Sequence, residues 1–201
     1  MSKEAFTSHK LNPLLMKRWS PRAFSDKQVG EDKLVRVLEA ARWAPSASNI
    51  QPWVFFPGMK GDDIYQKIFQ TLVEFNQLWC KHAPVLVLNC SKTTNDNGKQ
   101  NGTWQYDLGQ AVAHLSIQAM DEDLYVHQMS GFDAEKAAEL FELPPDVKAV
   151  SVSALGYIGD PGILHPRMQK SERAVRERKD LDTFVFSAKY GEHSPLAESD
   201  S

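Results

Sequence analysis

The sequence predicts a single α+β domain, in which helices and strands alternate along the chain around one hydrophobic core. Three observations support this fold class. Segments with a helical spacing of apolar residues are interleaved with short apolar runs. The 201 residues suffice for one sizeable core. No Gly-x-Gly-x-x-Gly follows a strand candidate, and no repeat or linker divides the chain, so we expect neither a dinucleotide-binding fold nor a second domain.

The first half of the chain predicts two helices and two strands. Helical spacing of apolar residues predicts helices over 31–44 and 61–80. Residues 53–56 are a short apolar strand candidate, which we expect to end at Pro57-Gly58. Residues 85–88 are continuously apolar, which is typical of a strand buried on both faces. The two helical stripes consist of Leu34, Val37, Leu38 and Ala41, and of Ile64, Ile68, Leu72 and Phe75.

The second half begins with a polar loop over 92–103, which we expect to be the most mobile segment. A second long helix follows from Asp107, and a shorter helix covers about 133–142. Alternation over 148–158 predicts a central strand. The last forty residues are basic and then acidic, which indicates an extended arm with a frayed tail.

Composition excludes several classes of protein. A net charge of −3 argues against a general nucleic-acid binder, because such proteins carry an excess of Lys and Arg. Cys80 and Cys90 provide neither a disulfide framework nor metal-ligand spacing, which favours a reducing compartment. The N-terminus lacks the apolar core of a signal peptide, and no stretch is long enough to span a membrane. We therefore expect a cytoplasmic protein that neither inserts in membranes nor binds a metal.

Two short strings concentrate polar side chains. In residues 17–24, the cationic segment, Arg18, Ser20 and Arg22 alternate and share one face if the backbone is extended. The planar fork of Arg suits phosphate oxygens, and Ser adds a compact donor. A solvated basic turn would contain the same residues, so the pattern alone leaves both interpretations open. The same alternatives hold for a later basic cluster, which consists of Arg173, Arg176, Arg178 and Lys179.

Residues 44–53, the amide loop, follow the first long helix and carry Ser46, Ser48, Asn49 and Gln51. Amide side chains read both donors and acceptors on the edge of a heterocycle. Capping and turn positions also favour Ser and Asn, and Trp53 after this loop is equally consistent with core packing.

Acid–base groups are not gathered into a recognisable catalytic set. Of the six histidines, His82 and His127 lie in stretches that could form a pocket, and we expect both to be structural. The acidic run Asp121-Glu122-Asp123 is typical of a solvated helix end. No nucleophile elbow is present, so the chain does not look like a self-sufficient hydrolase. A bound cofactor is therefore expected to carry the reaction.

The two polar segments contain motifs that follow each other in an order known from one protein family. Arg-x-Ser-x-Arg-x-Phe at 18–24, followed by Ala-Pro-Ser-Ala-Ser-Asn-x-Gln-Pro-Trp at 44–53, resembles the FMN-dependent nitroreductase family. Further matches follow in the family's order, so the resemblance covers residues 14–186. They are Phe75-Asn76, Ala83-Pro84, Tyr106-Asp107-Leu108-Gly109-Gln110-Ala111, Ser130-Gly131-Phe132-Asp133, Leu155-Gly156-Tyr157-Ile158-Gly159 and Arg176-x-Arg178-Lys179-x-Leu181.

The resemblance implies a homodimer with two FMN sites at the subunit interface, each lined by both chains. The implied fold has a central, mostly antiparallel sheet flanked by helices, and a C-terminal arm that extends to the partner subunit. Residues 1–201 would form one FMN-binding domain, with a core over about 14–186 and a flexible tail over 187–201.

The resemblance also implies roles for individual residues. The FMN phosphate and ribityl chain would be held by Arg18, Ser20, Arg22, Arg176 and Arg178, and by a backbone contact from Trp19. The partner subunit would contribute Pro45, Ser46, Ser48 and Gln51 to the ribityl chain and the isoalloxazine ring. Asn76 would contact the pyrimidine edge, and Ser130-Gly131 would place a backbone amide near flavin N5.

The activity that this resemblance implies is ping-pong hydride transfer through flavin N5, with no catalytic side chain. NADH or NADPH would be the donor, and nitroaromatics, quinones or a related small molecule would be the acceptor. A specialised dehydrogenase or dehalogenase is an alternative within flavin chemistry. Two further alternatives are a redox-responsive flavin-binding module with little turnover and a small-anion-binding protein without flavin.

The chain departs from the family pattern at Trp79, where many larger relatives carry a Lys near flavin N1 and O2. A missing cation makes negative charge on the flavin less favourable, unless Lys81 or a backbone donor compensates. Trp79 is expected either to wall the substrate pocket or to pack in the core. A Leu-Gly-Leu stretch of the family reads Glu122-Asp123-Leu124 here.

Overall fold

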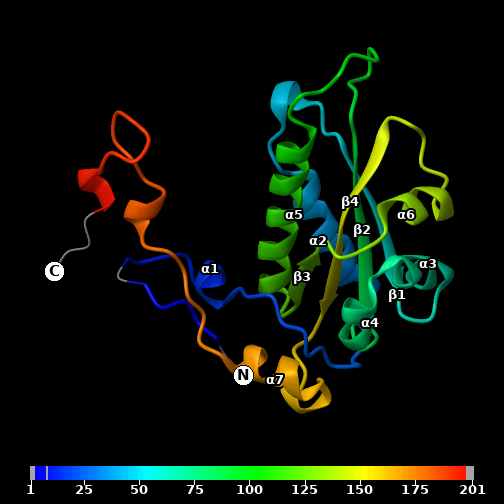
Figure 1. Ribbon diagram of the computed structural model, residues 1–201. Helices are drawn as coiled ribbons and strands as arrows, with labels where there is room; N and C mark the ends of the chain where they lie inside the picture. The colour runs from blue at the N-terminus through cyan, green and yellow to red at the C-terminus, as the bar shows by residue number, and fades with distance from the viewer. Residues whose placement is uncertain (1–2, 8, 198–201) are drawn as a thin grey trace.

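The computed structural model describes residues 3–7 and 9–197, and it contains one antiparallel sheet. The strand order is β1-β2-β4-β3, with β2 and β4 in the middle (Figure 1). The predicted α+β class and the antiparallel sheet are therefore confirmed. The strands are β1 (Trp53–Met59), β2 (Val85–Lys92), β3 (Tyr125–Met129) and β4 (Val147–Gly156).

Helices cover both faces of this sheet (Figure 1). One layer contains α2 and α5, and the opposite layer contains α3, α4 and α6. The α-helices are α1 (Pro13–Lys17), α2 (Glu31–Arg42), α3 (Asp63–Thr71), α4 (Glu74–Cys80), α5 (Trp104–Asp121), α6 (Ala134–Leu140) and α7 (Pro166–Arg173). The short 3-10 helices are η1 (Ala47–Asn49), η2 (Pro161–Ile163), η3 (Leu181–Thr183) and η4 (Pro195–Ala197).

Strand β2 is buried on both faces, as its continuous apolar run predicts. Val85 and Val87 pack with the α2 and α5 layer, whereas Leu86 and Leu88 pack with the other layer. This alternation is the two-residue period of a strand. The sheet therefore forms the wall between two apolar clusters.

The predicted helix over 61–80 is wrong in one respect, because it is broken into α3 and α4 at Leu72 and Val73. Leu72 forms an isolated bridge with Phe132, and Val73 N–H donates to the carbonyl of Gly131 at 3.1 Å. These contacts with a segment far away in the sequence replace helical hydrogen bonds. The apolar stripe also ends at the break, since Phe75 is exposed.

Two strand predictions also need correction. Strand β1 does not end at Pro57-Gly58 but continues through Met59, and Pro57 pairs with Val87. Because β1 is an edge strand, the missing N–H of proline can face solvent without breaking the sheet. Strand β3 was not predicted, because it is only five residues long and polar residues interrupt it; it forms the other edge of the sheet beside β4.

The C-terminal region begins with α7, a helix that the sequence pattern did not indicate. Residues 174–197, called the arm below, then run away from the sheet and stand apart from α5 (Figure 1). Apolar side chains on the arm are exposed: Phe184, Tyr190 and Leu196. The tail predicted over 187–201 lies partly outside the described residues. Among those residues, no helix combines the length and apolarity needed to cross a membrane.

The close approach of Gly159 to the cationic segment provides a test of this packing. A Cβ at Gly159 would lie 2.5 Å from the carbonyl carbon and oxygen of Phe24. We expect Gly159→Ala to lower the free energy of unfolding by about 2 kcal/mol, because backbone atoms must move apart. Urea denaturation measures the change. Gly102→Ala is the matched control, since nothing lies within 4 Å of its Cβ position, and it should change stability by less than about 0.5 kcal/mol.

Candidate functional site

The cationic segment joins α1 to α2 and is fastened to the end of β4. Phe24 forms an isolated bridge with Ile158, and Gly159 N–H donates to the carbonyl of Ala23 at 2.7 Å. The side chains of Ala23 and Phe24 are completely buried. The segment has almost no regular structure of its own, so these tertiary contacts decide where its side chains lie.

One buried and one half-buried side chain, those of Glu172 and His127, also hold the backbone of the cationic segment. Oε1 of Glu172, on α7, accepts hydrogen bonds from the backbone N–H groups of Arg22 at 2.8 Å and Ala23 at 3.0 Å. On the other side, Nδ1 of His127, on β3, lies 2.9 Å from the carbonyl oxygen of Pro21. A carbonyl only accepts, so this ring nitrogen carries the proton.

Burial lowers the pKa of His127 to about 4, and the neighbouring Arg22 guanidinium contributes to the shift. The hydrogen bond to Pro21 opposes it. His127 is therefore neutral near pH 7 and packs against Trp79, with ring centroids 4.6 Å apart. The expectation that His127 is structural agrees with this geometry. Trp79 is itself completely buried and also packs near Phe24, so of its two expected roles the structure has core packing.

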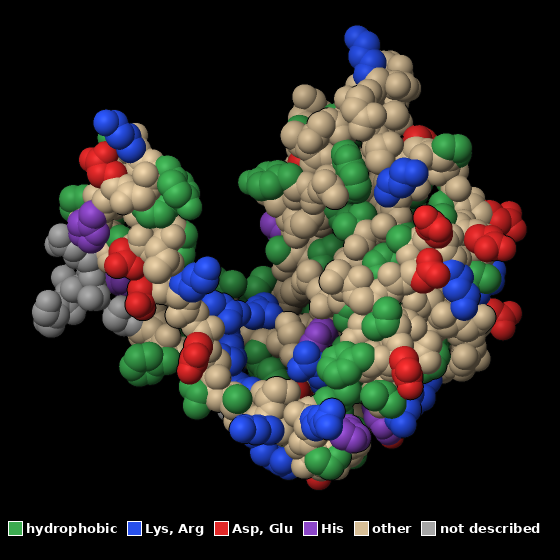
Figure 2. All heavy atoms as spheres, viewed as in Figure 1, with side chains coloured by type: hydrophobic (Ala, Val, Ile, Leu, Met, Phe, Trp, Pro, Cys, Tyr) green, Lys and Arg blue, Asp and Glu red, His purple; other side chains and the backbone are tan. Residues whose placement is uncertain are grey.

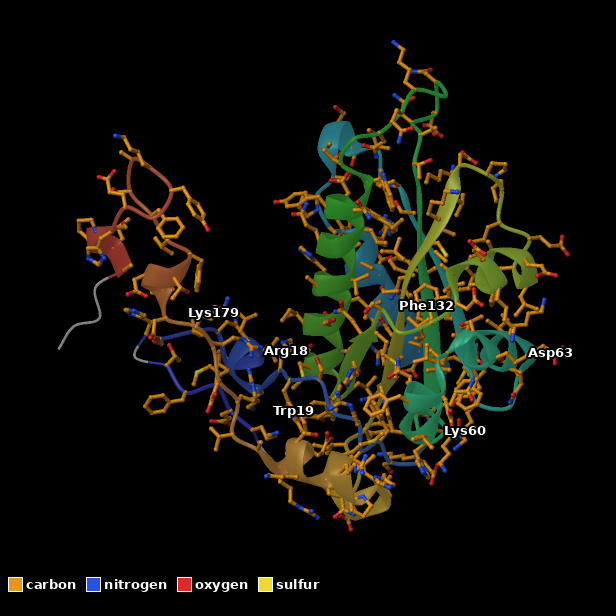
Figure 3. The ribbon with its side chains drawn as sticks, in the orientation of Figure 1. Arg18, Trp19, Lys60, Asp63, Phe132 and Lys179 are labelled. Carbon is orange, nitrogen blue, oxygen red and sulfur yellow. The ribbon has the colours of Figure 1, made fainter. Side chains whose placement is uncertain are left out.

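Three arginines come together between the arm and the cationic segment. Arg18 has a lowered pKa, first because of burial and then because Arg176 and Arg178 lie nearby. Figure 2 shows Lys and Arg side chains gathered in the hollow between the arm and the body, and Figure 3 labels Arg18 and Trp19 near the base of the arm. Within residues 3–7 and 9–197, no carboxylate forms an ion pair with these three arginines. Arginines that are gathered without carboxylate partners can bind an anion.

The arginines differ in how many of their donors are already used. Nη1 of Arg176 donates to the carbonyls of Lys3 at 2.6 Å and Met16 at 3.1 Å. Nη1 of Arg18 lies 3.4 Å from Oγ of Ser20. The Nε of Arg22 is buried and has no hydrogen-bond partner, an arrangement that a bound acceptor would relieve.

Asn76, on α4, and Gly131, after β3, are in direct contact. Nδ2 of Asn76 donates to the carbonyl of Gly131 at 2.9 Å. This hydrogen bond does not involve the side-chain oxygen of Asn76. A Cβ at Gly131 would lie 2.7 Å from Nδ2 of Asn76, so only glycine fits here without movement. The ring of Phe75, next to Asn76, lies 5.9 Å from the Arg22 guanidinium carbon, which links this pair to the cationic segment.

The amide loop lies elsewhere in the same chain, near the N-terminal end of α5. The backbone N–H of Ala47 donates to Oδ1 of Asp107 at 3.3 Å. The cationic segment runs near the opposite end of this 18-residue helix (Figure 1), which is about 27 Å long at 1.5 Å per residue. One chain therefore does not bring Pro45, Ser46, Ser48 and Gln51 to the arginine cluster.

Three side-chain-bearing residues in the amide loop have left-handed backbone conformations. Ser48 has φ 49°, Asn49 has φ 56° and Gln51 has φ 51°. Such conformations cost of order 1 kcal/mol each and are concentrated at functional sites. A hydrogen bond from Gln51 N–H to Oγ of Ser46 at 3.0 Å helps to hold this conformation.

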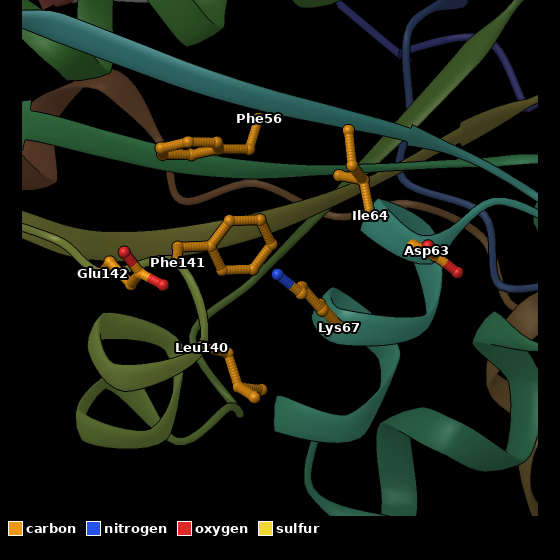
Figure 4. Close-up of a pocket in the computed structure, with 7 residues that line it drawn as sticks. All are labelled: Phe56, Asp63, Ile64, Lys67, Leu140, Phe141 and Glu142. Atoms are coloured by element: carbon orange, nitrogen blue, oxygen red, sulfur yellow. The ribbon is translucent and has the colours of Figure 1, made fainter.

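Two open hollows lie away from the arginine cluster. One, of about 220 Å³, lies between α3 and the end of α6, and in Figure 4 Lys67 points toward the ring of Phe141. The other, of about 310 Å³, lies between the amide loop and residues 95–97. Neither hollow is lined by a residue of the cationic segment or the arm.

Sequence reasoning did not single out Glu172. The signal that marks it is its spacing from Met168, because both residues lie on the buried face of α7 at i and i+4. An acidic residue on the buried stripe of a basic helix needs an internal partner. That partner is the backbone of the cationic segment, about 150 residues earlier in the chain.

Residues 15–68 match a family model described as the nitroreductase family. An uncharacterised 15.4 kDa protein in the ask 5′ region of Mycolicibacterium smegmatis is 31% identical over 140 residues, which cover 67% of this chain and 92% of that protein. A putative NADH dehydrogenase/NAD(P)H nitroreductase of Methanothermobacter thermautotrophicus is 28% identical over 144 residues, covering 70% of this chain and 73% of that protein.

Among solved structures, one described as an oxidoreductase containing FMN is 31% identical and has a TM-score of 0.89, covering 96% of this chain and 98% of that chain. A nitroreductase family protein of Clostridium difficile is 24% identical with a TM-score of 0.67, covering 88% of this chain and 96% of that chain, and it shows the shared fold. The fold of this chain is therefore that of the nitroreductases.

The lowered pKa of His127 predicts a pH dependence of stability. In the unfolded chain His127 takes up a proton near pH 6.5, whereas the folded protein binds it only near pH 4, so stability falls as pH decreases through this window. Between pH 7 and pH 5 the wild type should lose about 2 kcal/mol more than His127→Gln. Urea denaturation at both pH values measures this difference. Equal losses in the two proteins would contradict the assignment.

Proposed function

This chain belongs to the nitroreductase family and is an NAD(P)H-dependent flavin oxidoreductase, and we propose that it reduces nitroaromatics, quinones or a related acceptor by ping-pong hydride transfer. The observation that carries this proposal is a cluster of three arginines, Arg18, Arg176 and Arg178, with which no carboxylate of the described residues forms an ion pair. The contact between Asn76 and Gly131 supports it. The cluster has the chemistry of a phosphate site, and the contact offers amide and backbone groups to a ring edge.

The residues present fit FMN by two further observations. The buried Nε of Arg22 lacks a partner, and a flavin carbonyl or ribityl hydroxyl would provide one. The position of Gly131 has no room for a Cβ, which is typical of backbone that closely approaches a ligand or another side chain. The proposed site therefore contains cations for the phosphate and amides for the ring.

We assign the phosphate chiefly to Arg18 and Arg178, with Ser20 and Trp19 in the same segment. Arg176 contributes charge, while its Nη1 holds the carbonyls of Lys3 and Met16. Asn76 is assigned to the pyrimidine edge of the flavin, and the backbone at Ser130-Gly131 to the region of N5.

When bound, FMN would supply the redox chemistry, which is hydride transfer between NAD(P)H and the acceptor. The chain itself binds and orients the flavin and stabilises charge on it. Trp79 is completely buried and uncharged, so it supplies no cation to a flavin. Arg22 is the cation that remains close to Asn76, through its contact with Phe75, and we assign to it the stabilisation of negative charge on the ring.

We further propose that the site is completed by a second copy of the chain. The amide loop lies near the far end of α5 from the cationic segment, so Pro45, Ser46, Ser48 and Gln51 would serve the site of the partner subunit. Exposed apolar residues on the arm support an extended contact with that partner: Phe184, Tyr190 and Leu196 are 57%, 95% and 85% exposed.

In this proposal residues 14–186 form one FMN-binding core in a cytoplasmic protein. Both cysteines, Cys80 and Cys90, are free thiols in the apolar interior, which agrees with a reducing compartment.

The function is tested by anaerobic titration of the FMN-loaded protein. We expect NADH or NADPH to bleach the flavin absorbance, and a nitroaromatic or quinone to restore it, because the donor and the acceptor react in turn at one ring. Absorbance spectra measure both half-reactions. A protein that binds FMN but is bleached by neither donor would be a flavin-binding module with little turnover, and a protein that stays colourless with added FMN would have another function.

The phosphate assignment is tested with Arg18→Ala and Arg178→Ala combined. Loss of two charge-assisted contacts should weaken FMN binding by about 100-fold, at roughly 1.5 kcal/mol for each contact. Riboflavin, which lacks the phosphate, should bind as it does to the wild type. Quenching of flavin fluorescence measures both affinities. Arg173→Ala removes one charge from a residue bonded to Gln169 and is the control; unchanged FMN binding in the double variant would exclude the assignment.

A further inference from the structure

Glu172 is a buried carboxylate beside a cluster of cations that it does not neutralise. Its side chain is on α7 and is only 2% exposed. Its Oε1 accepts from the backbone N–H groups of Arg22 at 2.8 Å and Ala23 at 3.0 Å. A negative charge close to a phosphate site weakens anion binding, so this residue needs another reason to be there.

The bonds of Glu172 connect two parts of the arginine cluster that are far apart in sequence. Arg22 and Ala23 belong to the cationic segment, which also carries Arg18. Glu172 itself lies four residues before Arg176, where α7 passes into the arm. The carboxylate therefore joins the segment that carries Arg18 to the helix that directly precedes Arg176 and Arg178 in the arm.

A second set of contacts closes the same connection through the N-terminal residues. The carbonyl oxygen of Glu172 accepts from Nζ of Lys3 at 2.6 Å, and Nζ of Lys3 lies 4.5 Å from the ring centroid of Trp19. The carbonyl of Lys3 in turn accepts from Nη1 of Arg176 at 2.6 Å. The cationic segment, the N-terminal residues and the base of the arm are thus linked by hydrogen bonds that start at one residue.

We propose that Glu172 is a positioning residue that sets the spacing of Arg18 relative to Arg176 and Arg178, and with it the affinity for the phosphate of FMN. This inference rests on the proposed function. Glu172 does not touch the flavin; it acts through the backbone at Arg22 and Ala23. Arg18, Arg176 and Arg178 are the cations assigned to the phosphate, so loss of Glu172 weakens binding of a phosphorylated flavin more than binding of a flavin without phosphate.

Substitutions of Glu172 differ in whether they leave a hydrogen-bond acceptor for the backbone N–H groups of Arg22 and Ala23. Glu172→Ala removes the acceptor and leaves both donors without a partner in a buried place. Glu172→Gln keeps an oxygen at the same distance from the backbone and removes only the charge. Glu172→Asp keeps the charge but draws it back by one methylene. Glu135→Ala, on the exposed side of α6, is the matched control for loss of a glutamate.

The experiment measures the dissociation constants of FMN and riboflavin for the apoprotein by quenching of flavin fluorescence. We expect Glu172→Ala to weaken FMN binding at least tenfold and riboflavin binding by no more than threefold, since displacement of the backbone at Arg22 affects both flavins. Glu172→Gln should bind FMN within threefold of the wild type, and Glu135→Ala should match it. In a protein that already carries Arg18→Ala and Arg178→Ala, adding Glu172→Ala should change FMN affinity by less than threefold.

Several outcomes would overturn the inference. Equal weakening of FMN and riboflavin by Glu172→Ala would show a general role in folding, and unchanged affinities would show no role. If Glu172→Ala does not fold, Glu172→Asp decides the matter, since it should weaken FMN binding at least threefold and riboflavin binding by less than twofold. A wild type that binds FMN no better than riboflavin would overturn the proposed phosphate site itself, whereas a wild type that prefers FMN with unaffected Glu172 variants would overturn only this inference.

Discussion

The structure depends on the antiparallel pairing of β2 with β4 in the middle of the sheet. Every residue of β2 from Val85 to Ser91 is buried, so this strand needs apolar layers on both faces and β4 beside it. The helices fill those layers and leave the ends of the sheet free. Polar groups that hold a ligand are excluded from such a core, because burial without partners is costly. They are therefore found on connecting segments at the ends.

The cationic segment is the most important of these connections, and buried polar contacts place it. Its backbone carbonyl and N–H groups form hydrogen bonds with Gly159, His127 and Glu172, which lie in three separate parts of the fold. A segment fastened in this way presents its arginines in one arrangement despite having almost no regular structure. The proposed cofactor site thus has the rigidity of the sheet without lying within it.

Electrostatics distinguishes this region from the surface of α2. There the arginines are paired, Arg36 with Glu122 and Asp32, and Arg42 with Glu39. Such exposed pairs contribute little to stability and leave no charge for a ligand. In the hollow between the arm and the body the cations face one another, an arrangement that costs free energy until an anion binds. The amide loop of the same chain does not reach this hollow, and in the proposed dimer a second copy would supply it.

Features that depend on neighbours in the chain can be predicted from the amino-acid sequence. The buried run at 85–88 and the stripe of Leu108, Val112, Leu115 and Ala119 specify β2 and α5, because spacing alone shows which side chains share a face. The ordered motifs identified the family and the candidate cofactor. The break at Leu72, the edge strand β3 and the contacts of Glu172 become apparent only in the three-dimensional fold. Each of these depends on hydrogen bonds between residues distant in sequence, whose partners no local pattern specifies.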